Sequence, residues 1–125
     1  MPLSINILRW ILRFGFLASL GIGVALWGGH AYNYLQLHMW IGFIITFALL
    51  ALVALALLSR MRPILPLLAL VWAVLLPAIG IGQLKMMPGA NHWVMRVLHL
   101  IIGVGAIGFG EVLSKKMLRN DTPVV

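Results

Sequence analysis

The sequence predicts an all-α integral membrane protein, a single domain (residues 1–125) in which four transmembrane helices form an up-down bundle. Of its 125 residues, 63% are hydrophobic and only 9% are charged, and the mean hydropathy is +1.11. Four apolar stretches are each long enough to cross about 30 Å of hydrocarbon, which takes about 20 helical residues. The connections between them are short, so successive helices should run in opposite directions.

The four predicted spans follow one another with polar or turn-forming residues between them. They cover about 7–27, 37–58, 64–81 and 92–113. Pro63 suits the start of the third helix, and Pro88-Gly89 is a turn signal before the fourth. Arg9 and Arg13 ahead of the first apolar run resemble a signal peptide, but the run is long and no Ala-x-Ala site follows. We therefore interpret it as a retained membrane helix.

Basic residues gather on one side of the predicted bundle. These are Arg9, Arg13, Arg60, Arg62, Lys115, Lys116 and Arg119. Cytoplasmic loops are enriched in Lys and Arg, so we expect a multi-pass protein of the bacterial inner membrane with both termini in the cytoplasm. The net charge of +7 is then a topology signal, and no nucleic-acid partner is expected. Glu111 lies four residues before Lys115, the spacing of an ordinary helical ion pair.

A short pattern occurs twice in this chain. Leu-His-x-x-Ile-Gly covers residues 37–42 and, 61 residues later, 98–103. Each copy follows a Gly-Ile-Gly and an earlier histidine, His30 or His92. Two crossings restore the chain direction, so repeat A (about 5–60) and repeat B (about 63–118) should be parallel helix hairpins related by an axis along the membrane normal. The alternative is coincidence between short apolar stretches.

The duplicated histidines, His38 and His99, are the candidate metal ligands. Neutral imidazole is a good ligand of haem iron, and two imidazoles from different helices would make a low-spin, six-coordinate b-type haem. The chain has no cysteine, which excludes a thiolate ligand and covalent attachment through Cys-x-x-Cys-His. Without a metal, the same histidines could cap a helix or hydrogen-bond across the bundle.

Glycines and a second pair of histidines accompany the ligand candidates. Gly42 and Gly103 each lie one turn after a histidine, where the missing side chain would make room for a porphyrin; the alternative is close helix packing. His30 and His92 are expected near the outer interface. They could bind a propionate, relay a proton, contact a quinone, ligate a second cofactor, or simply be solvated.

Arg96 is a basic residue inside the fourth span, three residues before His99. Glu111 is fifteen residues further on, roughly 22 Å along a helix, so the two cannot pair within this helix. Arg96 therefore needs water, a lipid phosphate or a ligand anion. A haem propionate fits, with Lys85 assisting from the adjacent loop; the alternative is that Arg96 snorkels to the outer headgroups.

The helix pairs that carry Leu-His-x-x-Ile-Gly resemble the four-helix membrane b-type cytochromes, a group that includes cytochrome b-561-type proteins and bacterial superoxide oxidase. The duplicated histidine helices are also similar to those of haem A synthase. The resemblance implies b haem on paired histidines, here His38 and His99, and electron exchange with quinones or small redox partners. Many members hold a haem near each face, but this chain has no histidine in its inner half. The residues allow one outer haem, or two close together that use all four histidines.

The leading hypothesis is a membrane-bound b-type cytochrome that carries single electrons between the quinone pool and an acceptor on the outer side. Its small size and short loops favour a subunit of a larger redox complex, with membrane lipid, quinone and other membrane subunits as partners. If it is an enzyme, it would be a haem-dependent oxidoreductase. Two alternatives are a cofactor-free structural or assembly subunit and a subunit in which histidine ligates a chlorophyll-type pigment.

Overall fold

A computed structural model describes residues 2–30, 32–86 and 89–120, and its secondary-structure elements there are all helices joined by short turns. Its elements are α1 (Pro2–Trp27), the 3-10 turn η1 (Tyr32–Tyr34), α2 (Leu35–Leu58), α3 (Ile64–Gly82) and α4 (His92–Asn120). The four α-helices are long and apolar enough to cross a membrane. The predicted all-α class and the four spans are thereby confirmed. Pro88 of the predicted turn lies outside the described residues, whereas Gly89 has φ +90°, a conformation that glycine adopts readily.

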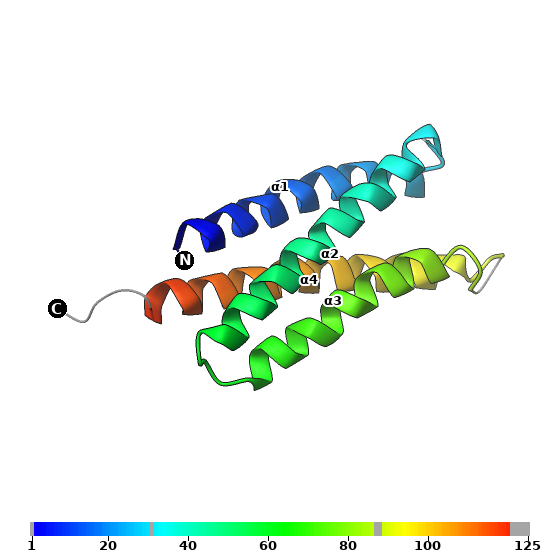
Figure 1. Ribbon diagram of the computed structural model, residues 1–125. Helices are drawn as coiled ribbons and strands as arrows, with labels where there is room; N and C mark the ends of the chain where they lie inside the picture. Colours follow the sequence, from blue (N-terminus) through cyan, green and yellow to red (C-terminus); the bar gives the residue numbers. More distant parts are fainter. Residues whose placement is uncertain (1, 31, 87–88, 121–125) are drawn as a thin grey trace.

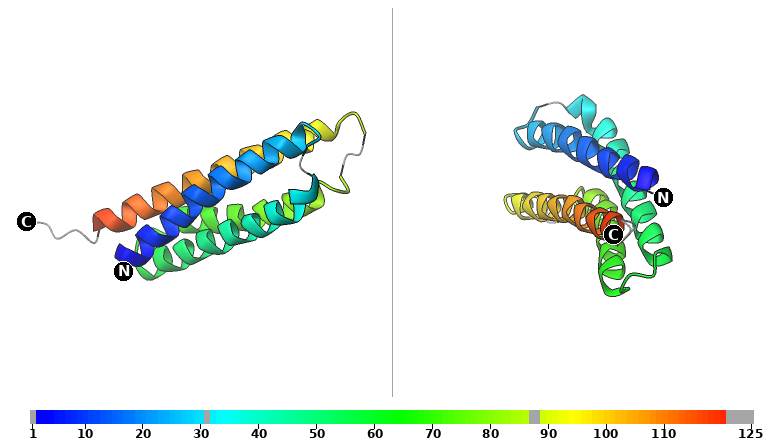
Figure 2. Two further views of the ribbon diagram at one scale, coloured as in Figure 1. Left: turned by 90° about the horizontal axis from the view of Figure 1, so that it is seen from above. Right: turned by 90° about the vertical axis from the view of Figure 1, so that its left-hand side faces the viewer.

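The helices alternate in direction and form one packed bundle (Figure 1). α1 packs against α2 and α4, α3 packs against the same two helices, and α2 and α4 touch across the middle. Figure 2 shows the same arrangement from two further sides. We call the end where α1 begins and α4 ends the basic end, and the opposite end, where η1 lies, the histidine end.

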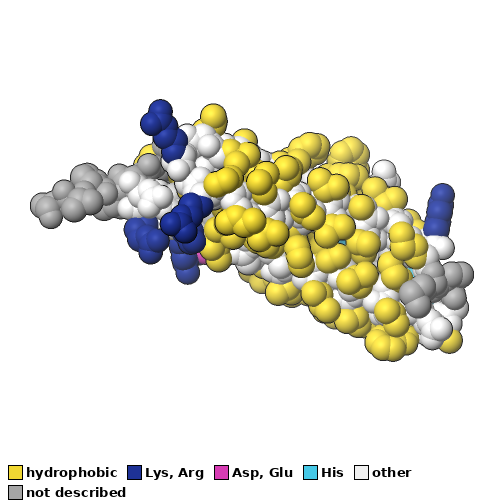
Figure 3. Space-filling view, turned by 90° about the horizontal axis from the view of Figure 1, so that it is seen from below, with side chains coloured by type: hydrophobic (Ala, Val, Ile, Leu, Met, Phe, Trp, Pro, Cys, Tyr) yellow, Lys and Arg dark blue, Asp and Glu magenta, His cyan; other side chains and the backbone are white. Residues whose placement is uncertain are grey.

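The distribution of side chains fits a membrane-embedded bundle. On the face in Figure 3, apolar side chains cover the middle, and lysine and arginine lie only toward the two ends. Large hydrophobic residues point outward from every helix. Examples with more than half of their surface exposed are Phe14, Phe47, Val74 and Val104. In water so much exposed apolar surface would promote association, whereas in a bilayer it is matched by lipid.

Dense packing is concentrated toward the basic end. The fully buried side chains there come from all four helices: Ile5, Leu12, Leu49, Leu52, Ala56, Ala69, Ala73, Ala106 and Leu113. Two glycines of α4 permit this packing. A Cβ on Gly110 would collide with Leu12 of α1, and one on Gly105 would collide with Trp72 of α3. The indole Nε1 of Trp72 also donates a hydrogen bond of 2.7 Å to the carbonyl oxygen of Ile102, which fixes α3 against α4.

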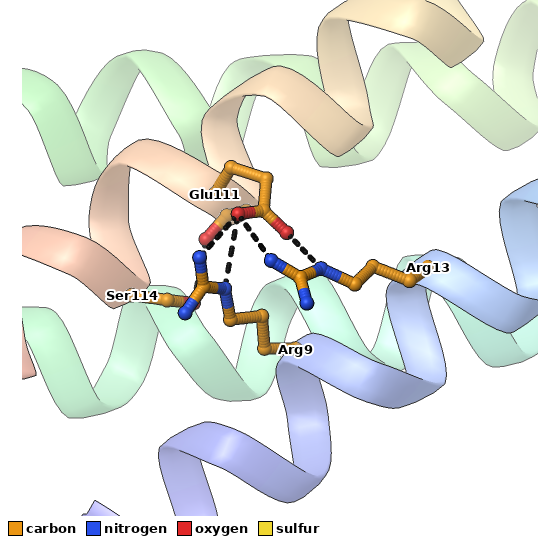
Figure 4. A network of polar contacts seen from close by, with 5 residues as sticks. Arg9, Arg13, Glu111 and Ser114 are labelled. Carbon is orange, nitrogen blue, oxygen red and sulfur yellow. Dashed lines mark hydrogen bonds and ion pairs between the residues drawn. The ribbon is translucent and has the colours of Figure 1, made fainter.

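The predicted ion pair between Glu111 and Lys115 is wrong. Glu111 instead accepts hydrogen bonds from two arginines of α1 (Figure 4). Arg9 contacts Oε2 at 2.7 and 2.9 Å, and Arg13 contacts both carboxylate oxygens at 2.6 and 3.0 Å. Because Lys115 is exposed and the arginine forks match a carboxylate geometrically, the contacts between helices prevail over the pair within α4.

Candidate functional site

The two histidines of the repeated pattern come together at the histidine end of the bundle. His38 lies in the first turn of α2 and His99 about two turns into α4. Their ring centroids are 6.2 Å apart and their ring planes are inclined by 69°. Both side chains are partly buried. The two residues belong to different helices, so the packing of α2 against α4 is what brings them together.

A cavity of about 340 Å³ surrounds this histidine pair and is bounded by all four helices. Six of the eight candidate site residues line it: His38, Gly42, His92, Arg96, His99 and Gly103. Further lining residues come from α1 and α3, among them Ser19, Gly23, Pro77 and Gly80. Its volume lies at the lower end of the range for ligand pockets, roughly 300–1,000 Å³.

The other two candidate residues stand apart from this cavity. His30 follows α1 and Lys85 follows α3, and both side chains are exposed. Neither is part of the cavity lining. The predictions that these residues contact a propionate or a second cofactor gain no support from their positions.

Gly42 and Gly103 border open space. A Cβ built on either glycine meets no atom within 4 Å in the described part of the chain. Close helix packing, the alternative explanation of these glycines, therefore does not account for them. The contrast with Gly105 and Gly110, where a Cβ collides with a neighbouring helix, shows that the chain uses glycine in two different ways.

The two Gly-Ile-Gly segments pack against the histidine rings. A Cβ on Gly23 would lie 3.3 Å from Cε1 of His38, and one on Gly80 would lie 3.0 Å from Cε1 of His99. Each histidine thus rests on a glycine of the preceding helix in the chain. Both segments belong to the repeat, but a role for them could not be inferred from sequence alone. The recurrence of Gly-Ile-Gly before each histidine was the sequence signal for this packing.

The hydrogen bonding of the two imidazoles is unequal. Nδ1 of His38 is 3.2 Å from the hydroxyl oxygen of Ser19 in α1, within hydrogen-bond distance. Nδ1 of His99 is buried and has no hydrogen-bond partner among the described residues. Ser19 was missed by sequence reasoning, because a single serine in an apolar helix carries no motif.

Arg96 lies on the cavity lining and reaches across to α1. Its Nη1 donates to the carbonyl oxygen of Trp27 at 3.3 Å. This carbonyl belongs to the last turn of α1, where helix carbonyls lack a partner within the helix. The guanidinium has further donors, so this contact leaves Arg96 able to bind an anion as well. Arg96 and the partly buried His92 make the cavity lining polar near the start of α4.

A larger but shallower groove of about 690 Å³ runs along α1 and α2. Its lining is almost wholly apolar: Leu3, Asn6, Ile7, Trp10, Ile11, Phe14, Gly15, Ala18, Ile41 and Ile44. It contains no titratable side chain and faces outward between two helices. The cavity at the histidine end therefore gathers the candidate site residues, whereas the lining of this groove is apolar apart from Asn6.

Searches against models of protein families, curated proteins and solved structures found no match to this chain.

Proposed function

We propose that this chain is a membrane-bound b-type cytochrome that holds one haem b between His38 and His99. The observation that carries the proposal is the distance of 6.2 Å between the two ring centroids. A metal ion bound by two imidazoles on opposite sides, through bonds of about 2.1 Å, would separate the centroids by roughly 6–7 Å. The apposed rings thus have the spacing that a shared metal requires.

The ligand count favours a tetrapyrrole over a bare ion. No group of three or more His, Cys, Asp or Glu side chains capable of holding a metal occurs within residues 2–30, 32–86 and 89–120. Two imidazoles alone are too few for a stable protein site, since structural zinc takes four ligands. A porphyrin supplies the remaining ligands itself. Gly42 and Gly103, with open space beside them, provide room at its faces.

The chemistry of imidazole favours iron over the magnesium of a chlorophyll-type pigment. Imidazole is a suitable ligand for iron, whereas magnesium prefers oxygen ligands. Two imidazoles with centroids 6.2 Å apart would supply two nitrogen ligands to one iron. Arg96 and His92 at the same cavity would hold the carboxylates of the porphyrin.

The proposed setting is the bacterial inner membrane, with both termini in the cytoplasm. The support is the gathering of basic residues at the basic end, opposite to the four histidines, together with the positive-inside rule. The haem then lies in the outer half, and electrons pass between the quinone pool and an acceptor on the outer side. We further propose that the two hairpins are parallel repeats and that the chain is a subunit of a larger redox complex.

The test is a visible spectrum of the purified, detergent-solubilised chain after haem loading, recorded oxidised and dithionite-reduced. We expect the Soret and alpha bands of a low-spin b haem. The double variant His38→Ala/His99→Ala should lack them, whereas His30→Ala, an exposed histidine outside the cavity, should keep them. A colourless wild-type protein that co-purifies with partner subunits would instead favour the cofactor-free structural subunit.

A further inference from the structure

The two histidines differ in the residue that stands behind each of them. Ser19 lies one turn before Gly23, the glycine under His38, and Leu76 lies one turn before Gly80, the glycine under His99. The hydroxyl of Ser19 is hydrogen-bonded to Nδ1 of His38 at 3.2 Å. At the matching position Leu76 has no hydrogen-bonding group, and Nδ1 of His99 is buried without a partner among the described residues.

This difference affects how firmly each imidazole can hold a metal. With Nδ1 of His38 engaged by Ser19, its Nε2 is the nitrogen left for a ligand. A metal-ligating histidine normally donates its second ring N–H to an acceptor, which fixes the ring and raises its basicity; loss of that acceptor weakens metal binding by roughly 10–100-fold. His99 lacks such an acceptor in the described residues.

The surroundings of His99 also leave it room to move. A Cβ on Gly80 would lie 3.0 Å from Cε1 of His99, so the ring rests on that backbone. Beside Gly103, one turn further along α4, there is open space. Gly42 also borders open space, but the hydrogen bond to Ser19 holds His38 in place.

We propose that Ser19 is a positioning residue that makes His38 the firmly held axial ligand, and that His99 is the exchangeable one. A small neutral ligand such as carbon monoxide would then bind the reduced iron in place of His99. This inference rests on the proposed haem site. It adds a binding position for a small molecule on the His99 side of the proposed haem. It also makes the two histidine ligands unequal in function.

The test compares haem retention and carbon monoxide binding in the full-length, haem-loaded, dithionite-reduced chain. We expect wild type to bind carbon monoxide, seen as a shift of the Soret band and loss of the sharp alpha band of the bis-imidazole form. His99→Ala should keep haem at least tenfold better than His38→Ala. Ser19→Ala should weaken haem retention by roughly 10–100-fold and shift the midpoint potential. Ser19→Thr, which keeps the hydroxyl, should restore both.

Two further variants separate positioning from packing. Ser114→Ala removes a serine hydroxyl that bonds the carbonyl of Gly110 in α4, far from the cavity lining, and should change neither haem retention nor potential. Leu76→Ser offers a hydroxyl at the position that matches Ser19, on the lining of the same cavity, and should lower the affinity for carbon monoxide. Equal haem loss in His38→Ala and His99→Ala, with Ser19→Ala like wild type, overturns this inference alone. Wild type that takes up no haem overturns the proposed function as well.

Discussion

Replacing Glu111 by Gln tests the interhelical ion cluster at the basic end. Four hydrogen bonds of 2.6–3.0 Å end on this carboxylate. The Gln keeps one acceptor oxygen but loses the charge, and it leaves Arg9 and Arg13 facing one another in a partly buried site. Breaking a fully buried ion pair from one side costs about 3–5 kcal/mol.

The exposure of the cluster reduces this figure. The side chains of Arg9, Arg13 and Glu111 retain 17, 32 and 24% of their accessible surface. We therefore expect Glu111→Gln to lower the free energy of unfolding by about 2–3 kcal/mol, roughly a 30- to 150-fold change in the equilibrium constant.

The assay is reversible unfolding in mixed detergent and dodecyl sulfate micelles, followed by circular dichroism. Lys115→Gln is the matched control, because Lys115 is exposed and lies one turn from Glu111 in the same helix. An exposed substitution of this kind should change stability by less than about 0.5 kcal/mol. Equal losses in the two variants would refute the reasoning, since the arginine contacts would then contribute no more than a surface charge.

Three other substitutions probe packing. Trp72→Phe removes the 2.7 Å hydrogen bond to the carbonyl of Ile102 and should cost about 1 kcal/mol in the same unfolding assay, and an unchanged midpoint would contradict that contact. Gly110→Ala drives a methyl group into Leu12 and should cost about 1–3 kcal/mol, a cost that a more stable variant would disprove. The methyl group of Gly103→Ala meets open space, so in the haem-free protein this change should stabilise α4 by about 0.5–1 kcal/mol. The same change should reduce haem retention, and retention equal to wild type would show that the space beside this glycine is not used.

The helices could be predicted from the sequence because hydrocarbon thickness sets their length. The helix limits differ most where apolar character stops before the helix does. α4 continues to Asn120, beyond the predicted end near Leu113, because Lys115, Lys116 and Arg119 carry it past the apolar run without interrupting its backbone hydrogen bonds. Hydropathy marks the part of a helix that lies in lipid, and not where the helix itself ends.

The clustering of candidate residues at one cavity also had a signal, the repeated Leu-His-x-x-Ile-Gly. No signal in the sequence identified the partners of single polar residues. Glu111 meets residues 98 and 102 positions away, so only the packing of α1 on α4 reveals the contact, and spacing within α4 pointed to Lys115 instead. Ser19 and His38 are likewise joined by the packing of α1 on α2.

Dense packing and the candidate ligand cavity lie at opposite ends of the bundle. Toward the basic end, alanines and leucines fill the interior, and the arginine and glutamate cluster ties the first helix to the last. Toward the histidine end, glycines leave a cavity around two imidazoles. A bundle with a cavity of about 340 Å³ lacks the side-chain contacts that would fill that space. The dense end therefore stabilises a fold that keeps a ligand-sized space open. If that space holds a prosthetic group, loading it should restore the missing contacts and raise the unfolding midpoint, whereas an unchanged midpoint would mean that the group binds elsewhere.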